Sequence, residues 1–284
     1  MSNSKSVLIT GCSSGIGKAL SYYLKTKGWT VYPTTKEDDE ASLLRDEGFE
    51  SFKLDIRSKT SIDAALENIL KKSNGHIDAL INNAGFELIG AIEDLPLEAI
   101  RQQFETNVFG ALEITKALIP IMRKHNNGKI LFIGSAACSR VSFPFSGAYC
   151  ASKHALGAFV DALRREIIDS KISITIIDPG PFKSKAAKNS EEIFAKYIDA
   201  KRSRYGSIYN KMFANFKKID EALSEKKLTA LAKLIYNTLE SKHPKIRIIT
   251  PRSPIIYEII RRFFPYKIQD FYLFCKMRFK DKII

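Results

Sequence analysis

The sequence SVLITGCSSGIG at residues 6–17 decides the fold of this chain of 284 residues. Its apolar half is typical of a buried strand, and the residues after the glycines, KALSYYLKTKG, keep a helical apolar pattern. In this setting Gly11 permits a tight turn, Gly15 lets the backbone approach a pyrophosphate, and Gly17 allows close helix packing. The spacing is G-x3-G-x-G rather than G-x-G-x-x-G, but its setting favours a dinucleotide-binding turn over an ordinary one.

Apolar runs and helical patterns alternate through most of the chain. The runs typical of strands are SVLIT, WTVYP, FKLD, IDALIN, KILFIG, ISITIID and KIRIIT. The helical patterns between them lie at residues 15–27, 38–47, 59–71, 97–124 and 148–169. Strands separated by such helices indicate a parallel sheet covered on both faces, because antiparallel hairpins need no such crossovers. We predict a doubly wound α/β fold of the Rossmann type with about seven strands, forming one domain over residues 1–250 with an extension over residues 251–284.

The composition is that of a globular protein. Hydrophobic residues make up 45% of the chain and charged residues 27%, so it can bury a core without a disulfide or a metal. The four cysteines form no CxxC pair and the four histidines no ligand spacing, which indicates neither a disulfide framework nor a metal site. The apolar run before Gly11 is too short for a signal peptide, and no run of about 18 apolar residues occurs. We expect a cytoplasmic protein, or one peripheral to a membrane.

Positive charge is concentrated near the carboxyl end of the chain. The formal net charge is +14, and residues 242–284 hold eleven Lys or Arg against three acidic residues. Such a surplus can serve an anionic membrane, nucleic acid, a phosphorylated ligand or solubility, and composition does not choose among them. The sequence has no nucleic-acid recognition motif, so we expect no nucleic-acid partner.

The basic tail, residues 252–284, also carries an amphipathic helical pattern. Arg261 and Arg262 stand beside its apolar face, and Pro265 ends the helix. The apolar face is formed by Ile255, Ile256, Ile259, Ile260, Phe263 and Phe264. This face could lie on an anionic membrane and admit a lipidic substrate, each surface Lys or Arg contributing on the order of 1 kcal/mol. The alternative is that it covers the substrate pocket or a subunit contact.

A polar, lysine-rich stretch at residues 182–218 interrupts the alternation of strands and helices. It follows the strand that ends at Asp178, and so lies at the carboxyl edge of the sheet, where ligands bind in such folds. Its aromatic residues are Phe194, Tyr197, Tyr205, Tyr209, Phe213 and Phe216. We predict a substrate lid here, with an ordinary amphipathic helix pair packed on the core as the alternative.

The most informative residues for chemistry are Tyr149 and Lys153, four apart in GAYCASKHA, and Ser135 at the end of KILFIGS. On a helix, Tyr149 and Lys153 share one face with Cβ atoms about 5–6 Å apart. A phenol has a pKa of about 10, and a nearby ammonium should lower it toward the pH at which proton transfer is efficient. Ser135 could donate a hydrogen bond to a substrate oxygen. Together the three indicate a hydride-transfer site.

Five motifs occur in a single order along the chain: the glycine turn, NNAG at residues 82–85, Asn107 with Ser135, the Y-x3-K of Tyr149 and Lys153, and PGP at residues 179–181. In these motifs the chain resembles the short-chain dehydrogenase/reductase family, from residue 5 to about residue 250. Through NVFGALEITKALIPIMRK, YCASKHAL and the tail it is most similar to the branch of hydroxysteroid, retinol and acyl-lipid carbonyl reductases.

The resemblance implies a role for each member of a catalytic set. Tyr149 would be the catalytic acid/base, and Ser135 would donate a hydrogen bond to the substrate oxygen. Lys153 would bind the nicotinamide ribose and tune Tyr149, while Asn107 would anchor a proton-relay water. Taken singly, Asn107 could instead be a helix-bending polar residue, Ser135 a strand-end cap, and Lys153 part of a solvated helix face.

The resemblance also implies a set of cofactor contacts. Asp55 would lie near the adenine, with an N-cap of the next helix as the alternative, and Ser184 would hold the carboxamide. The full set is Gly11, Ser13, Ser14, Gly15, Ile16, Gly17, Thr35, Lys36, Asp55, Asn83, Ala84, Gly85, Tyr149, Lys153, Pro179, Gly180 and Ser184.

The choice between NADP and NAD depends on the end of the second strand, VYPTTKE. An NAD enzyme usually places a carboxylate there for the adenosine ribose, but this chain has Thr35, followed by Lys36. A basic residue at this position matches a 2′-phosphate, which favours NADP. Glu37, Asp38 and Asp39 follow, and either one of them turns toward the ribose or they begin the next helix.

We therefore expect an NADP-dependent oxidoreductase that interconverts an apolar ketone or aldehyde and its alcohol. The alternative is a non-catalytic NADP-sensing or scaffold protein with the same fold. The resemblance further implies a homo-oligomer formed through the long helices at residues 97–124 and 148–169.

Overall fold

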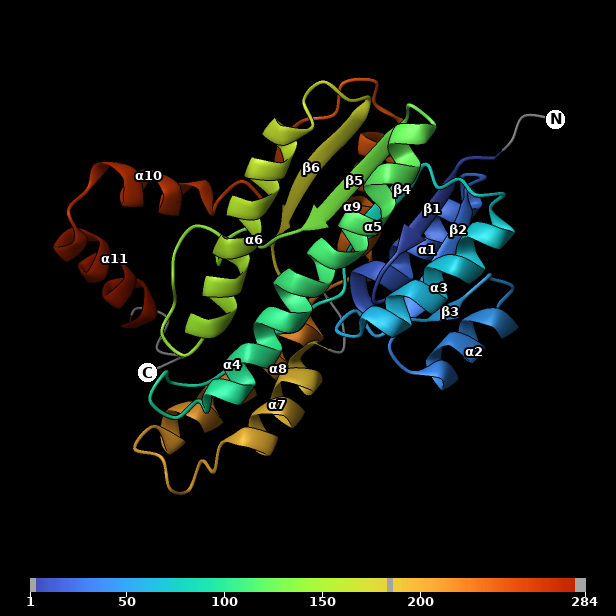
Figure 1. The fold of residues 1–284 in the computed structure, drawn as a ribbon. Helices are drawn as coiled ribbons and strands as arrows, with labels where there is room; N and C mark the ends of the chain where they lie inside the picture. The colour runs from blue at the N-terminus through green and yellow to red at the C-terminus, as the bar shows by residue number, and fades with distance from the viewer. Residues whose placement is uncertain (1–3, 183–185, 279–284) are drawn as a thin grey trace.

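A seven-stranded parallel sheet forms the centre of the molecule (Figure 1). The structure is a computed structural model and describes residues 4–182 and 186–278. The strands lie in the order β3-β2-β1-β4-β5-β6-β7, and each pairs in parallel with its neighbours. Their bounds are Ser6–Ile9 (β1), Thr30–Thr35 (β2), Phe52–Lys53 (β3), Ala79–Asn82 (β4), Gly128–Ile133 (β5), Ile172–Pro179 (β6) and Arg247–Thr250 (β7). The predicted doubly wound α/β fold is confirmed.

Helices connect the strands and cover both faces of the sheet. The stretch expected to be helical at residues 97–124 consists of two α-helices joined by a π-helical turn, η1. The helices before β6 are Gly15–Thr26 (α1), Asp38–Asp46 (α2), Lys59–Lys72 (α3), Leu97–Phe104 (α4), Glu105–Gly110 (η1), Ala111–Lys124 (α5) and Gly147–Glu166 (α6). Those after it are Ala186–Tyr197 (α7), Gly206–Ala222 (α8), Glu225–Glu240 (α9), Ile255–Phe263 (α10) and Tyr266–Arg278 (α11).

Successive side chains of β1 point to opposite faces of the sheet, as they must in an extended strand. Leu8 packs with residues of α3, α5 and α6 on one face. Val7 and Ile9 pack with residues of α1, α2 and α9 on the other. Because both faces are buried, the strands carry continuous apolar runs rather than an alternating pattern.

Helices α7 and α8 and the turn between them carry the aromatic residues of the expected lid. Phe194, Ile198 and Tyr209 pack with residues of the loop after β4 in a third apolar cluster. Tyr209 is fully buried, and its hydroxyl accepts a hydrogen bond from the amide of Ala91 at 2.9 Å and donates one to Asp94. Helices α7 and α8 are therefore packed on the body of the protein, as the alternative interpretation expected. Their action as a lid stays a prediction.

The carboxyl-terminal helices α10 and α11 lie beside α6, outside the sheet (Figure 1). Pro265 stands between them, at the position where the sequence predicted the first helix to end. None of the residues of α10 is buried, but the ring of Tyr257 packs edge-on against Phe143, with centroids 5.6 Å apart. The helix thus contacts the body through one side and exposes the rest.

The described residues, 4–182 and 186–278, contain no helix that is both long and apolar enough to span a bilayer. The same residues include no group of three or more acidic, histidine or cysteine side chains arranged to hold a metal ion. All four cysteines are free thiols.

Candidate active site

The loops singled out in the sequence leave the sheet at its carboxyl edge. The glycine turn at residues 10–17 follows β1, residues 36–37 follow β2, and residues 83–85 follow β4. Ser135 lies just beyond the end of β5, and residues 179–180 lie at the end of β6. Because all the strands are parallel, these segments meet on one side of the molecule, where such folds bind ligands.

The glycine turn is packed too tightly for side chains. Gly11 has a φ of +72°, and a Cβ there would lie 2.8 Å from the Cα of Ala84. A Cβ on Gly17 would lie 2.3 Å from the carbonyl oxygen of Gly11. The side-chain amide of Asn83 donates hydrogen bonds to the carbonyl oxygens of Thr10 and Gly11, at 2.9 and 2.8 Å. NNAG therefore fixes the shape of the glycine turn from the neighbouring strand.

The amino end of α1 has the character of an anion-binding site. Ser14 is the N-cap residue, but its hydroxyl makes no capping hydrogen bond, and the first turn, which includes Gly15 and Ile16, holds no acidic residue. The first amides of a helix have no partner within the helix and carry the positive end of its dipole. They fit the pyrophosphate that the sequence predicted beside Ser13 and Ser14.

The end of β2 presents Thr35 and Lys36 as expected. Thr35 is buried and donates its hydroxyl hydrogen to the carbonyl oxygen of Glu37 at 2.8 Å. The ammonium of Lys36 is 58% exposed and lies 3.0 Å from the carboxylate of Glu37. Asp38 and Asp39 stand in the first turn of α2. These two carboxylates thus begin the helix, which was one of the two interpretations of the sequence.

Asp55 holds Arg57 rather than capping the next helix. The guanidinium of Arg57 makes a two-pronged contact with the Asp55 carboxylate, at 3.0 and 2.6 Å. This contact, helped by the charge of Lys36, lowers the pKa of Asp55. The N-cap of α3 is Ser58, whose hydroxyl accepts the amide hydrogen of Ser61 at 3.3 Å. Arg57 is therefore a second basic group beside Lys36, and no sequence motif marks it.

Tyr149, Lys153 and Ser135 come together at the start of α6. Tyr149 and Lys153 share one face of the helix, and Nζ of Lys153 lies 5.7 Å from the centre of the Tyr149 ring. The lysine is only 8% exposed, which excludes the solvated-face alternative. The side chain of Ser135 lies near the Tyr149 hydroxyl and acts to lower the pKa of the phenol. Ser135 also accepts the amide hydrogen of Cys138 at 3.3 Å, so it caps the strand end as well.

The protonation of Tyr149 differs from the sequence-based expectation. Burial raises the pKa of Tyr149 well above its usual value, and the carboxylate of Glu87 and the thiol of Cys138 act in the same direction. The side chain of Ser135 lowers the pKa of Tyr149, but its effect is smaller than that of burial. The pKa of Tyr149 is therefore raised, where the sequence led us to expect a lowered value, because desolvation of the phenolate is the largest effect on it. The effect of Lys153 on the phenol stays a prediction.

The pKa of Lys153 is also shifted by its surroundings. Burial lowers the pKa of Lys153 to about 8, although Asp178, Cys138 and Glu87 all act to raise it. Its ammonium donates a hydrogen bond to the carbonyl oxygen of Ile133 at 2.8 Å. The lysine charge therefore titrates close to neutral pH.

Asn107 lies in the π-helical turn η1 and ties three segments together. Its Oδ1 accepts the amide hydrogen of Phe86 at 3.0 Å, and its Nδ2 donates to the carbonyl oxygen of Phe86 at 3.0 Å and to the hydroxyl of Ser152 at 3.2 Å. A Cβ on Gly85 would lie 3.0 Å from Oδ1 of Asn107. The asparagine thus connects the NNAG loop with α6, and its role as a water anchor stays a prediction.

Three further side chains at this site were not predicted from the sequence. Glu87 accepts a hydrogen bond from the Ser146 hydroxyl at 3.0 Å, and burial raises the pKa of its carboxyl group. The thiols of Cys138 and Cys150 interact, and this raises the pKa of Cys138 and lowers that of Cys150. The sequence marked these residues only by their positions next to the motifs. Glu87 stands two residues after NNAG, Cys138 three after Ser135, and Cys150 one after Tyr149.

The end of β6 forms the far wall of the site. The carbonyl oxygen of Pro179 accepts the amide hydrogen of Ala136 at 2.8 Å, which joins this wall to the loop after Ser135. The amide of Gly180 donates to the carbonyl oxygen of Thr250 at 2.7 Å. The predicted carboxamide contact, Ser184, lies outside the described residues.

Comparison with known proteins gives a consistent result. The family model described as short chain dehydrogenase matches residues 5–193. An uncharacterized oxidoreductase, YbbO of Escherichia coli strain K12, is 37% identical over 185 residues, which are 65% of this chain and 68% of that protein. The NADPH-dependent 3-dehydrocapnine reductase of Ornithobacterium rhinotracheale is 28% identical over 284 residues, 96% of each chain. The 3-ketodihydrosphingosine reductase of Bacteroides thetaiotaomicron is 36% identical over 177 residues, 62% of this chain and 63% of that protein.

Solved structures share the fold. The crystal structure of a short-chain dehydrogenase from Streptomyces avermitilis superposes with a TM-score of 0.74 at 24% identity, covering 92% of this chain and 93% of that one. At that identity the likeness concerns the fold alone. The family model, which spans most of the chain, carries the assignment of the family.

Proposed function

The chain belongs to the short-chain dehydrogenase/reductase family, and from that premise we propose that it reduces an apolar ketone or aldehyde with NADPH. The observation that carries the proposal is the convergence of Ser135, Tyr149 and Lys153 at the carboxyl edge of the sheet, the edge at which the glycine turn also lies. Proton transfer at a carbonyl needs an acid and hydrogen-bond donors for the substrate oxygen. The hydroxyls of Ser135 and Tyr149, next to the buried ammonium of Lys153, can supply both.

Reduction needs an acid, and Tyr149 is suited to that role. A raised phenol pKa keeps Tyr149 protonated at neutral pH, so that its O–H can give a proton to the carbonyl oxygen. When bound, NADPH supplies the hydride that the carbonyl carbon accepts. The Ser135 hydroxyl donates a hydrogen bond to the same oxygen and stabilises its developing negative charge. Oxidation of an alcohol would instead need the phenolate, which burial disfavours.

Lys153 and Asn107 complete the catalytic set that we propose. The ammonium of Lys153, charged below a pKa of about 8, favours the phenolate that Tyr149 becomes after proton transfer. It would also bind the nicotinamide ribose. Asn107, fixed by the backbone of Phe86, would anchor a water through which Tyr149 recovers its proton.

Several residues support NADP as the cofactor. The glycine turn and the uncapped amino end of α1 fit a pyrophosphate. Lys36 and Arg57 lie at the ends of β2 and β3, where a 2′-phosphate would be held, and Thr35 replaces the carboxylate that would repel it. A relative that matches almost the whole chain is named an NADPH-dependent reductase.

The substrate that we propose is an apolar, lipid-like carbonyl compound. Two relatives are named reductases of 3-dehydrocapnine and of 3-ketodihydrosphingosine. The apolar cluster formed by α7, α8 and the loop after β4 includes Ala148, the residue before Tyr149. We place the apolar part of the substrate against this cluster, with α7 and α8 as its cover. The exposed apolar tail would bring the enzyme to the membranes in which such substrates reside.

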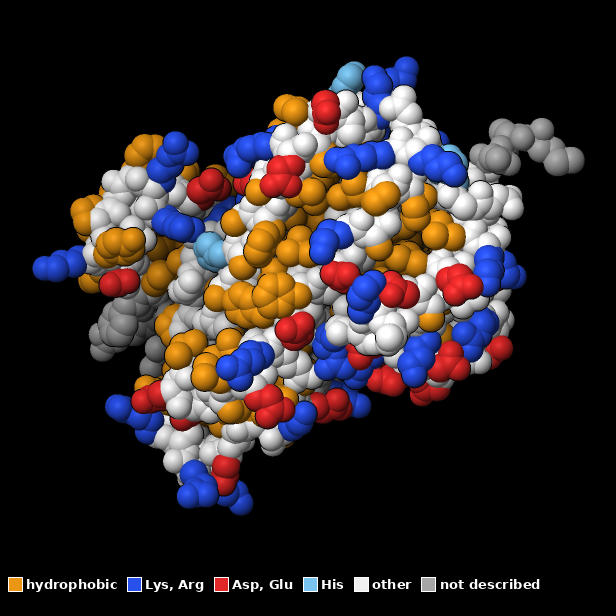
Figure 2. Space-filling view, in the orientation of Figure 1, with side chains coloured by type: hydrophobic (Ala, Val, Ile, Leu, Met, Phe, Trp, Pro, Cys, Tyr) orange, Lys and Arg blue, Asp and Glu red, His pale blue; other side chains and the backbone are white. Residues whose placement is uncertain are grey.

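We also propose that the enzyme is a homo-oligomer. Large apolar side chains on its long helices are exposed, with Leu97 at 65%, Phe109 at 48% and Phe159 at 47%. Figure 2 shows hydrophobic side chains gathered over α5 and α6 on this face. Such a patch is typical of a subunit contact, and sedimentation of the purified protein would measure it.

The proposed activity is tested by the consumption of NADPH with a panel of steroid, retinoid and long-chain lipid carbonyls. The Tyr149→Phe variant should lose at least about 100-fold in turnover but bind NADPH normally, because only the acid is removed. Tyr266→Phe, at a side chain that is 80% exposed in the tail, is the matched control and should turn over like the wild type. Retained turnover in Tyr149→Phe would contradict the proposed mechanism. Binding of NADPH without consumption on any carbonyl would favour the non-catalytic alternative.

A further inference from the structure

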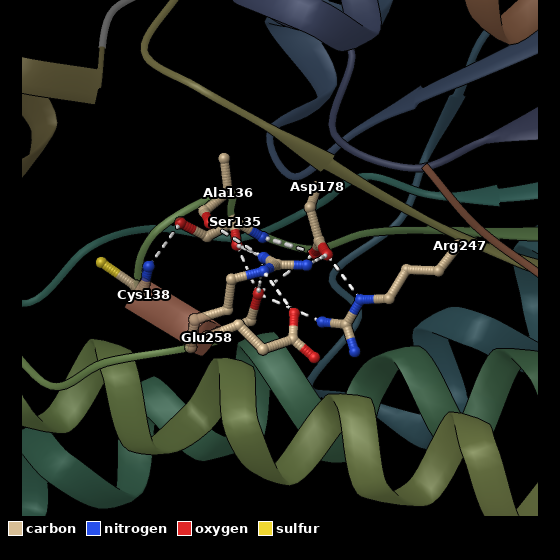
Figure 3. Close-up of polar contacts among 8 residues, drawn as sticks. Ser135, Ala136, Cys138, Asp178, Arg247 and Glu258 are labelled. Carbon is tan, nitrogen blue, oxygen red and sulfur yellow. Dashed lines mark hydrogen bonds and ion pairs between the residues drawn. The ribbon is translucent and has the colours of Figure 1, made fainter. Parts of the chain in front are cut away.

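The carboxylate of Asp178 holds the loop that begins with Ser135 (Figure 3). Asp178 is fully buried near the end of β6. Its Oδ1 accepts hydrogen bonds from the Ser135 amide at 3.1 Å and from the Ser139 hydroxyl at 3.2 Å. Its Oδ2 accepts from Nη2 of Arg140 at 2.8 Å and from Nε of Arg247 at 2.6 Å. One buried carboxylate thus joins the backbone of Ser135 to two arginines.

The guanidinium of Arg140 fixes the other side of the same loop. Arg140 is 3% exposed, and its Nη1 donates to the carbonyl oxygens of Ala136 at 2.8 Å and Ser135 at 3.3 Å. Both the amide and the carbonyl of Ser135 are therefore held by the ion pair of Asp178 and Arg140. A buried charge pair is costly unless hydrogen bonds compensate for the loss of water. The hydrogen bonds of this pair are made mainly with residues 135–139, and Asp178 also accepts one from Arg247.

The residue before Ser135 shows how closely the carboxylate approaches the backbone. A Cβ on Gly134 would lie 2.0 Å from Oδ1 of Asp178. Glycine at this position is therefore what lets Asp178 reach the Ser135 amide. The contact is built by both strands, β5 and β6, and is independent of the glycine turn.

Helix α10 of the tail also contacts Arg140. The carboxylate of Glu258 lies 3.4 Å from Nε of Arg140, and Nη1 of Arg261 donates to the carbonyl oxygen of Arg140 at 3.4 Å. Glu258 is 56% exposed, so this pair is screened by water and is weaker than the buried one. The chain of contacts runs from the tail through Arg140 to Asp178 and Ser135.

We propose that Asp178 is a positioning residue for Ser135, and that the tail helix α10 supports it by holding Arg140. The inference rests on the proposed function, because a fixed Ser135 matters only if its hydroxyl binds a reacting oxygen. Displacement of a reacting group by about 1 Å can cost about 100-fold in rate, so the loop geometry decides how well Ser135 works.

The charge of Asp178 has a second measurable effect, on the pKa of Lys153 and so on the pH dependence of the rate. Four groups from the elements around Lys153 face it: Asp178 from β6, Glu87 after β4, Cys138 after β5 and Tyr149 on α6. Asp178 raises the pKa of Lys153 against the effect of burial. Removal of its charge should therefore move the alkaline limb of the pH-rate profile to lower pH. Loss of folding stability alone would not move that limb.

The main test is the Asp178→Asn variant of the full chain, measured for kcat, KM, NADPH affinity and pH dependence. Asparagine keeps the shape and an acceptor for the Ser135 amide, but it leaves the arginines without their charge partner. We expect kcat to fall by about 10-fold or more with NADPH affinity within about twofold of wild type. The Ser135 amide, followed by hydrogen exchange in NMR, should exchange faster.

Asp78→Asn is the matched control. The Asp78 carboxylate also accepts a backbone amide hydrogen from a neighbouring strand, that of Ser6 at 2.8 Å, but it does so at the opposite edge of the sheet. We expect it to leave kcat, the pH limb and Ser135 exchange unchanged. Equal effects of Asp78→Asn and Asp178→Asn would reduce the role of Asp178 to folding, and would overturn the proposal.

Two milder variants keep the proposal testable if Asp178→Asn does not fold. Arg247→Gln, at a side chain 32% exposed, removes a positive charge from the Asp178 carboxylate and should move the alkaline limb to higher pH. Glu258→Gln, on the surface, should lower kcat by about two- to fivefold and speed the exchange of Ser135. An unchanged limb in Arg247→Gln would refute the role of Asp178. Unchanged exchange in Glu258→Gln would refute the role of the tail.

The outcomes also separate this inference from the proposed function. If the wild-type protein consumed NADPH with no carbonyl, the proposed function would fail. The exchange of the Ser135 amide would still decide whether Asp178 holds it, because that measurement needs no turnover.

Discussion

Nζ of Lys153 lies 2.8 Å from the carbonyl oxygen of Ile133, at the end of the strand that leads to Ser135. Burial in this position lowers the pKa of Lys153 to about 8. If the charged lysine is needed, the reduction rate should be constant at low pH and fall by about tenfold between about pH 7 and about pH 9. Initial rates of NADPH consumption across this range would measure it. A profile that stays flat to about pH 10 would show that the ammonium is dispensable.

The same burial predicts how stability depends on pH. The ordinary pKa of lysine is 10.5, so between about 8 and 10.5 the unfolded chain holds a proton that folded Lys153 has lost. Since the unfolded state then binds more protons, the free energy of unfolding should rise with pH in this window, by up to about 3 kcal/mol. Urea unfolding at several pH values would show this rise in the wild type. It should be absent from Lys153→Met, and an equal rise in that variant would assign the effect to other groups.

The sheet and its helices were predictable because the fold leaves a simple pattern. Both faces of each central strand are buried, so strands such as β5 and β6 appear as unbroken apolar runs. The glycine turn was predictable for a local reason, since its backbone needs residues without Cβ. Helix ends moved by only one to three residues, as at Gly147–Glu166, where the sequence suggested residues 148–169.

Gly17 offers a direct test of the turn. The Cβ of Gly17→Ala would lie 2.3 Å from the Gly11 carbonyl oxygen and 2.6 Å from Nδ2 of Asn83, so the turn must move. We expect a loss of about 1–3 kcal/mol in stability and at least about tenfold weaker NADPH binding, measured by fluorescence titration. Gly157→Ala on α6 is the control, because its nearest neighbour would be at an ordinary 3.9 Å, and it should gain up to about 1 kcal/mol. Normal NADPH binding by Gly17→Ala would show that the glycine turn is not part of the cofactor site.

Cofactor preference should depend on both basic groups at the ends of β2 and β3. Lys36→Ala and Arg57→Ala should each weaken NADPH binding by about tenfold and leave NADH binding nearly unchanged, because only NADPH carries the 2′-phosphate. Lys71→Ala, an exposed lysine that pairs with Glu67 on α3, is the control. Separate titrations with the two cofactors would measure the preference. Equal losses for NADPH and NADH would contradict the assignment.

The parts of the site that were not predictable are those that depend on packing between distant segments. Arg57 reaches the position beside Lys36 only because β3 pairs with β2, and Asp178 meets Arg140 only because β5 and β6 are neighbours. The direction of the Tyr149 pKa could not be predicted from its spacing to Lys153, because burial, which spacing does not reveal, is the largest cause of the shift.

The tail provides the last prediction, which concerns membrane binding. Its apolar side chains are at least 40% exposed at Ile256, Ile259, Phe263, Phe264, Tyr266, Ile268 and Phe271. With Arg261 and Arg262 beside them, they fit an anionic bilayer surface, where apolar contact and charge attraction act together. The wild-type protein should therefore float with vesicles of phosphatidylcholine and phosphatidylserine, and less with phosphatidylcholine alone.

Substitution of two strongly exposed phenylalanines of the tail, Phe263 and Phe271, decides whether the tail is responsible for membrane binding. Phe263→Ser with Phe271→Ser should weaken flotation by at least about tenfold, since each buried aromatic contributes about 1.5–3 kcal/mol. Ile168→Ser, at a side chain 79% exposed beyond the end of α6, is the control and should bind vesicles like the wild type. Raising the salt concentration should also reduce binding, because it screens the arginines. If the phenylalanine variant floats as well as the Ile168 control, the exposed face of the tail serves a contact other than the membrane.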